Sequence, residues 1–179
     1  MIPDTEGADG RSHIRRLLWP LAGILLVLLF VGGSGYRSSR SLHASWDLGH
    51  IAAFSLWCHL LLRLEPFRHA SRRRQWEIVI SFCLLFGGAT EAVQRVSGGD
   101  ASVGDLLRDL VGGVVTMAWF APTGSATTRK PFPGTRFLAW VLLSLSGFPL
   151  ARALTDEAIA RHQFPILADF ETPFEADRW

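Results

Sequence analysis

Pairs of polar side chains recur at helical spacing in this 179-residue chain, each beside a long apolar run. Asp47 and His50 lie three residues apart at the start of one run. Glu91 and Gln94, also three apart, close the next run. Residues at this spacing share one face of a helix. Carboxylates beside a histidine suit proton transfer, and they equally suit the binding of a divalent cation.

A further polar group opens the run that follows. It consists of Ser102, Asp105, Arg108 and Asp109. The two aspartates are four residues apart, which is one helical turn. Ser102 is a poor candidate nucleophile because only His50 could act as its base, and covalent catalysis is therefore disfavoured. Glu91 follows an apolar run and needs a polar partner, a role that Arg108 or His50 would serve.

The same residues also have structural explanations. Asp47 and Asp105 stand at predicted helix starts, where a carboxylate caps free backbone N–H groups and meets the positive end of the helix dipole. His50 alone is explained by a hydrogen bond between helices. Two readings therefore remain open: a functional polar site, with catalytic residues unassigned, or a purely structural polar cluster.

Five apolar runs must position these residues. The chain is 49% hydrophobic, and its mean hydropathy is +0.23. Runs of about 17–25 apolar residues are long enough to cross a bilayer as helices. The runs are Leu17–Gly33, Asp47–Leu64, Trp76–Val93, Asp105–Ala121 and Phe137–Leu154. We therefore predict an all-α membrane bundle of five transmembrane helices over residues 17–154, between a 1–16 segment and a 155–179 tail. The first run could instead be a cleaved signal peptide.

The basic residues predict the orientation of this bundle. Segments 1–16, 65–75 and 122–136 are basic, and they alternate with segments that carry fewer basic residues. By the positive-inside rule the N-terminus lies in the cytoplasm and the C-terminus outside. The polar ends of three helices then fall at one depth on the outer face, where we expect His50 within reach of a carboxylate. A net charge of +2 spread over three segments does not indicate nucleic-acid binding.

Small residues inside the runs have structural roles in this interpretation. Cys58 and Cys83 are read as buried hydrophobic residues, with no disulfide framework or metal motif. No cofactor is indicated. Glycines predict close contact between helices. They are Gly87, Gly88, Gly112 and Gly113.

Three short motifs, DLGHIAAF, TEAVQ and SVGDLLRDLVGG, occur in this order, and the chain resembles the VanZ-like membrane protein family over about residues 15–121. The matching positions are Asp47, His50, Glu91, Gln94, Ser102, Asp105 and Gly112. Asp109 stands where the family usually has Asn, Leu48 where it often has Lys, and an arginine is missing around Gly99. Asp109 and the missing arginine change the charge of the polar group.

The resemblance implies a multi-pass protein of the bacterial cytoplasmic (inner) membrane. The family's namesake is linked to resistance to the glycopeptide teicoplanin. The tail sequence FPILADFETPFEADRW also resembles the opening of a carbohydrate-binding β-sandwich module.

We expect binding of an envelope lipid or glycan headgroup at the outer polar site, in an accessory role in envelope homeostasis or antibiotic resistance. The partners would be membrane lipid and an envelope glycan or lipid-linked ligand. One alternative is a transferase or hydrolase with Glu91 or His50 as base and Asp105 or Asp109 as acid or metal ligand. Another is a structural partner protein of the membrane.

Overall fold

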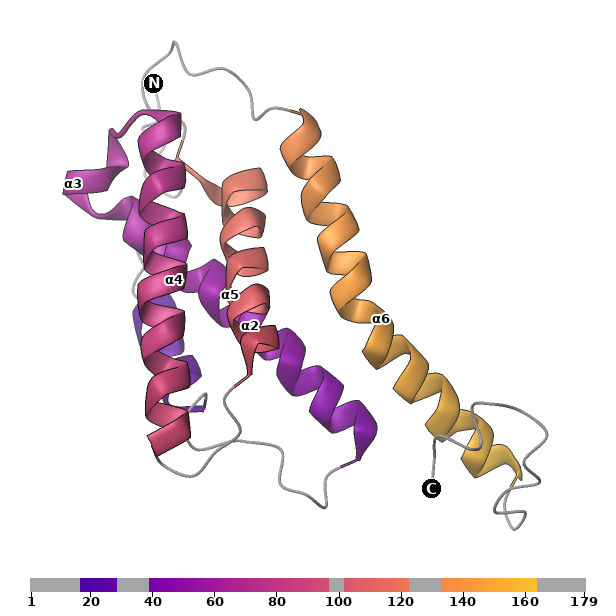
Figure 1. Ribbon diagram of the computed structural model, residues 1–179. Coiled ribbons are helices and arrows are strands. Elements are labelled where there is room, and N and C mark those ends of the chain that lie inside the picture. The colour runs from indigo at the N-terminus through magenta and orange to yellow at the C-terminus, as the bar shows by residue number, and fades with distance from the viewer. Residues whose placement is uncertain (1–16, 29–38, 97–101, 123–132, 164–179) are drawn as a thin grey trace, which may run out of the picture.

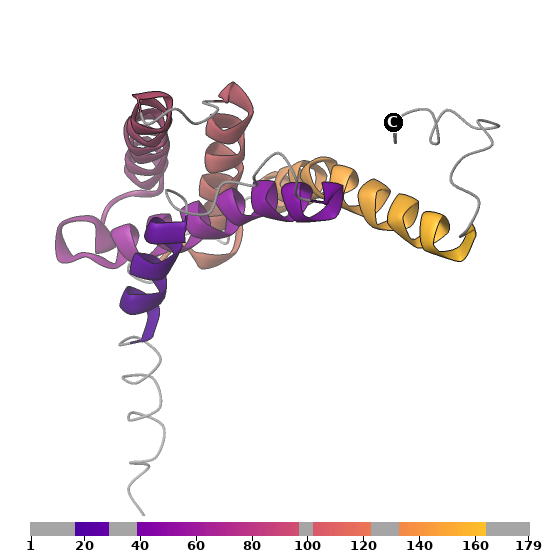
Figure 2. The same cartoon turned by 90° about the horizontal axis from the view of Figure 1, so that it is seen from below.

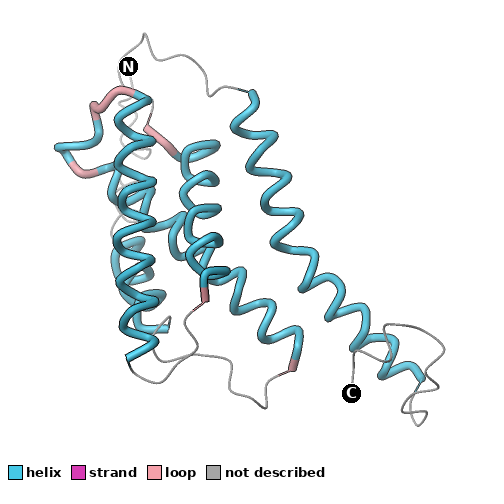
Figure 3. Tube along the Cα trace, viewed as in Figure 1, coloured by secondary structure: helices cyan, strands magenta, loops and turns pink. Residues whose placement is uncertain are grey.

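Helices form nearly all of the structure that is described. The computed structural model describes residues 17–28, 39–96, 102–122 and 133–163, and these contain no strand (Figure 3). A short apolar helix, Leu17–Leu28, comes first. The others are α2 (Arg40–Arg63), α3 (Glu65–Arg68), α4 (Arg72–Val96), α5 (Val103–Val115), the π-helix η1 (Thr116–Phe120) and α6 (Pro133–Gln163). The all-α prediction is confirmed for these residues.

The start of α2 differs from the prediction. The helix begins at Arg40, because Ser39 is its N-cap and accepts a hydrogen bond from the Leu42 N–H at 3.3 Å. Asp47 therefore lies about two turns inside the helix, and the interpretation of Asp47 as a cap is wrong. By contrast, Asp105 does lie in the first turn of α5, behind the N-cap Ser102.

Two further boundaries were predicted differently. The run that ends at Ala121 is not one α-helix, since α5 passes at Thr116 into the π-helix η1. The last helix continues to Gln163, so residues 155–163 of the predicted tail are helical. Residues 164–179, with their resemblance to a carbohydrate-binding module, and residues 1–16 lie outside the described residues.

The core forms around α5, which packs on both α2 and α4. Figure 1 shows α5 beside α4, with α2 crossing behind it. Phe54 is fully buried and contacts the ring of Trp57 at a centroid distance of 5.0 Å. The helix Leu17–Leu28 joins this core at Ala22, whose carbonyl accepts a hydrogen bond from the Trp57 indole at 3.1 Å. The hydrogen bond joins the N-terminal helix to α2.

Glycine permits the close approach of the helices at α5. A Cβ added to Gly112 would lie 2.7 Å from the Ile51 carbonyl oxygen, and one added to Gly113 would lie 2.8 Å from Val79 Cγ1. The backbones of α2 and α5 meet where no side chain fits, as predicted. Gly88 is different, because nothing lies within 4 Å of its added Cβ. The prediction of a close contact there is wrong.

The C-terminal part of the last helix extends away from α4 and α5 and lies beside the first turns of α2 (Figures 1 and 2). The Glu157 carboxylate accepts hydrogen bonds from the Ser41 backbone N–H at 3.1 Å and the Ser41 hydroxyl at 2.9 Å. A negative side chain on α6 thus meets the N-terminal end of α2, where the helix dipole favours it. Large apolar side chains of α6 remain exposed, among them Phe137, Trp140, Leu145 and Phe148.

Two of the described helices are long and apolar enough to cross a membrane. They are Arg72–Val96 and Gly134–His162, and only 22% and 11% of their apolar windows are buried within the chain. The described residues thus include two helices of spanning length whose apolar surface is mostly not covered by the chain. The helix α2 does not meet the same hydropathy requirement over a spanning length, and α5 has only 13 residues. Five spans remain a prediction.

Arginines mark one end of the bundle, which we call the basic end. Here α2 ends and α4 and α6 begin. Side chains from three helices donate to the last carbonyls of η1. Arg72 of α4 donates to the Met117 carbonyl, and His59 of α2 donates to the Phe120 carbonyl at 3.2 Å. Arg136 of α6 donates to another carbonyl of η1 at 3.4 Å. Two guanidinium groups and one imidazole therefore cap the helix terminus, where backbone oxygens lack partners.

Candidate polar site

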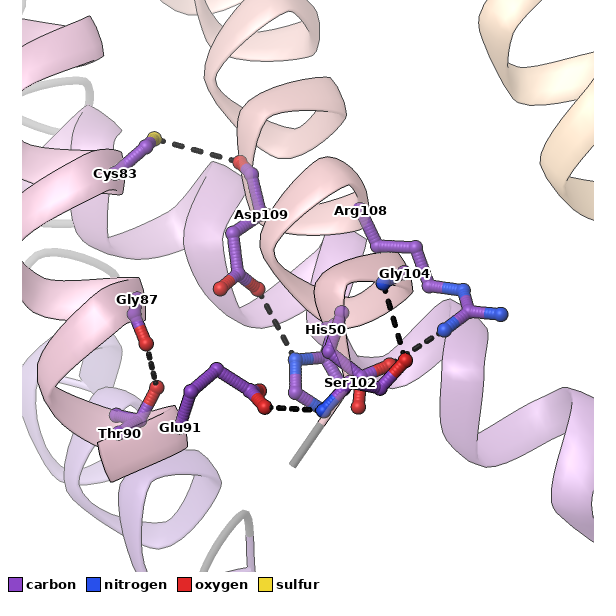
Figure 4. Close-up of polar contacts among 10 residues, drawn as sticks. His50, Cys83, Gly87, Thr90, Glu91, Ser102, Gly104, Arg108 and Asp109 are labelled. Carbon is purple, nitrogen blue, oxygen red and sulfur yellow. Dashed lines mark hydrogen bonds and ion pairs between the residues drawn. The ribbon is translucent and has the colours of Figure 1, made fainter. Parts of the chain in front are cut away.

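A buried histidine–aspartate pair joins α2 to α5. His50 Nδ1 lies 3.0 Å from Asp109 Oδ1, and the residues are only 2% and 0% exposed (Figure 4). The expectation that His50 lies within reach of a carboxylate from a neighbouring helix is confirmed. Because the carboxylate binds one ring nitrogen, it fixes the orientation of the imidazole.

Small groups on α4 make room for Asp109. A Cβ added to Gly87 would lie 2.6 Å from Asp109 Oδ2, so only glycine leaves space for this carboxylate. The Cys83 thiol, one turn earlier on α4, donates a weak hydrogen bond to the Asp109 backbone carbonyl at 3.4 Å. The sequence predicted close helix contact at Gly87. It did not show that the contact makes space for an acidic side chain.

Arg108 forms a second polar group beside this pair, together with two aspartates. Its guanidinium binds the Asp47 carboxylate of α2 at 2.8 Å and the Asp105 carboxylate one turn earlier on α5. The three side chains are only partly exposed, between 15% and 28%. Asp47 thus contributes to the polar group through an ion pair between helices.

Glu91 lies across the site, on α4. Its Oε2 accepts a hydrogen bond from the Ser102 backbone N–H at 2.6 Å, at the first free donor of α5. Arg108 is occupied by Asp47 and Asp105, so the predicted pairing of Glu91 with Arg108 is wrong. Gln94 lies one turn beyond Glu91 and is half-buried. We name these eight residues the polar site: Asp47, His50, Glu91, Gln94, Ser102, Asp105, Arg108 and Asp109.

Buried carboxylate oxygens of the polar site lack a hydrogen-bond partner within the described part of the chain. Glu91 Oε1 and Asp109 Oδ2 are buried and accept no hydrogen bond from the residues that the structure describes. An unsatisfied buried acceptor costs about 1–3 kcal/mol, and more when it is charged. Such atoms are uncommon in folded proteins, and they mark positions where a further donor would be stabilising.

The polar site carries more acidic than basic groups. Four carboxylates, from Asp47, Glu91, Asp105 and Asp109, face one guanidinium and one imidazole. Asp105 and Glu91 lie near enough to act electrostatically on His50. The Arg108 ion pairs and the His50–Asp109 pair therefore belong to one site. Within the described ranges no three His, Cys, Asp or Glu side chains are placed to hold a metal ion. The arrangement favours ligands that donate hydrogen bonds or carry positive charge.

Two threonines that the sequence interpretation did not single out form hydrogen bonds within and between these helices. The buried Thr90 hydroxyl donates to the Gly87 carbonyl at 2.7 Å, beside Asp109. The Thr116 hydroxyl donates to the Ser55 carbonyl of α2 at 2.7 Å. The only available signal was a hydroxyl within an apolar run, because such a group needs a nearby backbone carbonyl.

Comparison with known proteins adds no family assignment. The sequence matches no family model, and neither a curated protein nor a solved structure is significantly similar to it.

Proposed function

We propose that this chain is a multi-pass protein of the bacterial inner membrane, similar to the VanZ-like family, that binds an envelope lipid or glycan headgroup at the polar site. In this proposal five helices cross the membrane with the N-terminus in the cytoplasm, and the polar site opens outward. The order of the three motifs supports the similarity to the VanZ-like family. The arginines at the basic end support an orientation with that end in the cytoplasm. The role is accessory to envelope homeostasis or resistance to glycopeptide antibiotics.

The unsatisfied oxygens Glu91 Oε1 and Asp109 Oδ2 carry the argument for a ligand. Both only accept hydrogen bonds when ionised, so the matching ligand group must donate them. Sugar hydroxyls and ammonium groups donate hydrogen bonds. A phosphate alone does not, and it would be repelled by the excess of carboxylates. The site therefore favours a sugar or amine headgroup over an anionic one.

Binding of defined lipids tests the proposal. Purified protein in detergent would be titrated with diglucosyl-diacylglycerol and with phosphatidylglycerol of the same acyl chains, and bound lipid counted by native mass spectrometry. We expect the glycolipid to bind more tightly. Glu91→Gln and Asp109→Asn should each weaken glycolipid binding by about tenfold or more, since each removes a charged hydrogen-bond acceptor worth about 1.5–3 kcal/mol.

Glu65→Gln is the matched control. This substitution removes the same charge from an α3 side chain that is 77% exposed. It should leave glycolipid binding unchanged. Undiminished glycolipid binding by both site variants, or an equal loss of glycolipid binding in Glu65→Gln, would refute the proposal. Expression in a susceptible host should raise the inhibitory concentration of teicoplanin, and Glu91→Gln should reverse that effect.

The His50–Asp109 pair favours a second candidate function, a membrane-embedded transferase or hydrolase. A buried aspartate that orients an imidazole is the arrangement by which enzymes position a general base. Release of sugar from the bound glycolipid, lost in His50→Gln while binding persists, would distinguish this function from binding alone.

A further inference from the structure

An open groove of about 450 Å³ lies at the basic end, between the end of α2, α3 and the first turns of α4. We call it the α3–α4 groove. Its apolar lining comes from Leu61, Phe67, Ile78 and Phe82. Arg74 and Ser81 line it as well. An apolar channel with a cation at one end is suited to an amphiphilic ligand.

Arg74 differs from the neighbouring arginines because its charge is not compensated. Arg68 and Arg73 each form an ion pair with a glutamate on their own helix, and Arg72 donates to a carbonyl of η1. In the part of the chain that the structure describes, the Arg74 guanidinium forms no hydrogen bond or ion pair. The glutamate that also lines the groove, Glu77, is the partner of Arg73 at 3.0 Å. The uncompensated charge on the groove is therefore positive.

We propose that the α3–α4 groove binds an anionic glycerophospholipid of the surrounding membrane, with its phosphate on Arg74 and an acyl chain along the apolar wall. Arg74 and Phe82 are eight residues apart on α4, which corresponds to about 12 Å of helix. The lining thus changes from a charged to an apolar character over the distance that separates a lipid phosphate from the upper acyl chain. Cationic pockets beside membrane helices are attractive to anionic headgroups.

The inference depends on insertion of α4, a helix long and apolar enough to span a membrane. It does not depend on a ligand at the polar site, because the groove and the polar site share no residue. The two sites also differ in the sign of their charge. The polar site has an excess of carboxylates, whereas the groove has a free guanidinium.

Native mass spectrometry with two lipids tests the inference. Delipidated protein in detergent would be titrated with phosphatidylglycerol and phosphatidylcholine of identical acyl chains. A single arginine near a membrane surface accounts for about a fivefold preference for the anionic lipid. Arg74→Gln should abolish that preference. Arg68→Gln, which removes the same charge outside the groove lining, should retain it.

Filling the groove gives an independent measurement. Ser81→Trp places an indole among the lining residues, and it should reduce binding of both lipids at this site. The melting temperature of each variant would be measured to exclude unfolding as the cause of any loss. Equal binding of the two lipids by the unmodified protein would overturn the inference. So would equal loss of preference in Arg74→Gln and Arg68→Gln, or unchanged binding in Ser81→Trp.

Discussion

Replacement of Gly112 by alanine tests the helix contact on which the polar site depends. The new Cβ would lie 2.7 Å from the Ile51 carbonyl oxygen and 2.9 Å from both Phe54 Cβ and the Ser55 nitrogen. Ordinary contacts begin at 3.4 Å, so the shortest contact falls short by 3.4 − 2.7 = 0.7 Å. Two of the three atoms belong to the α2 backbone and cannot rotate away. The helices must therefore separate.

The cost of this separation can be isolated with a matched variant. Overpacking of a well-packed interface costs about 1–3 kcal/mol. Alanine also favours a helix over glycine by about 1 kcal/mol, which obscures the effect of one variant alone. Gly88→Ala carries the same propensity gain with nothing within 4 Å of its Cβ. The difference in unfolding free energy between the two variants should therefore be about 1–3 kcal/mol.

Reversible unfolding in mixed detergent micelles, followed by tryptophan fluorescence, measures both variants. Gly112→Ala should be the less stable variant. If Gly112→Ala and Gly88→Ala are equally stable, α2 and α5 do not approach as closely as described. The His50–Asp109 pair joins the same two helices, so its geometry would then lose its support as well.

Two further predictions concern the polar site and the orientation. Replacing either His50 or Asp109 by leucine leaves a buried polar partner unpaired and should cost about 3–5 kcal/mol, whereas the double replacement should recover part of the loss; strictly additive losses in the unfolding free energy would contradict the pairing. Reporter fusions after Arg74 should read cytoplasmic and fusions at Gly99 external, and the reverse result at either point would contradict the proposed orientation.

The location of the polar site was predictable because it depends on spacing. Residues three or four apart share a helix face, and polar side chains of apolar helices turn toward other helices rather than lipid. These two rules bring His50 near the carboxylates of α4 and α5. The rules do not predict which carboxylate pairs with His50. Asp109 is the closest partner because Gly87 leaves space beside it, and that is a property of packing.

Helix limits and ion-pair partners were less predictable because they depend on distant segments. The first turns of α2 are polar, and the apolar pattern places the helix start too late. These turns are helical with Ser39 as a cap and Glu157 of α6 at their free N–H groups. Arg108 had several acidic candidates within helical reach. The rotation of α2 decides in favour of Asp47, and no local pattern encodes that rotation.

The small share of α6 buried within the chain has a consequence for biogenesis. Every residue of the polar site precedes Pro122, and none belongs to α6. Ribosomes add about 5–20 residues per second, so the roughly forty residues to the end of α6 follow after about 2–8 s. The partners of the polar site are therefore all synthesised before the last helix is complete. Pairing among them can therefore begin before α6 is complete.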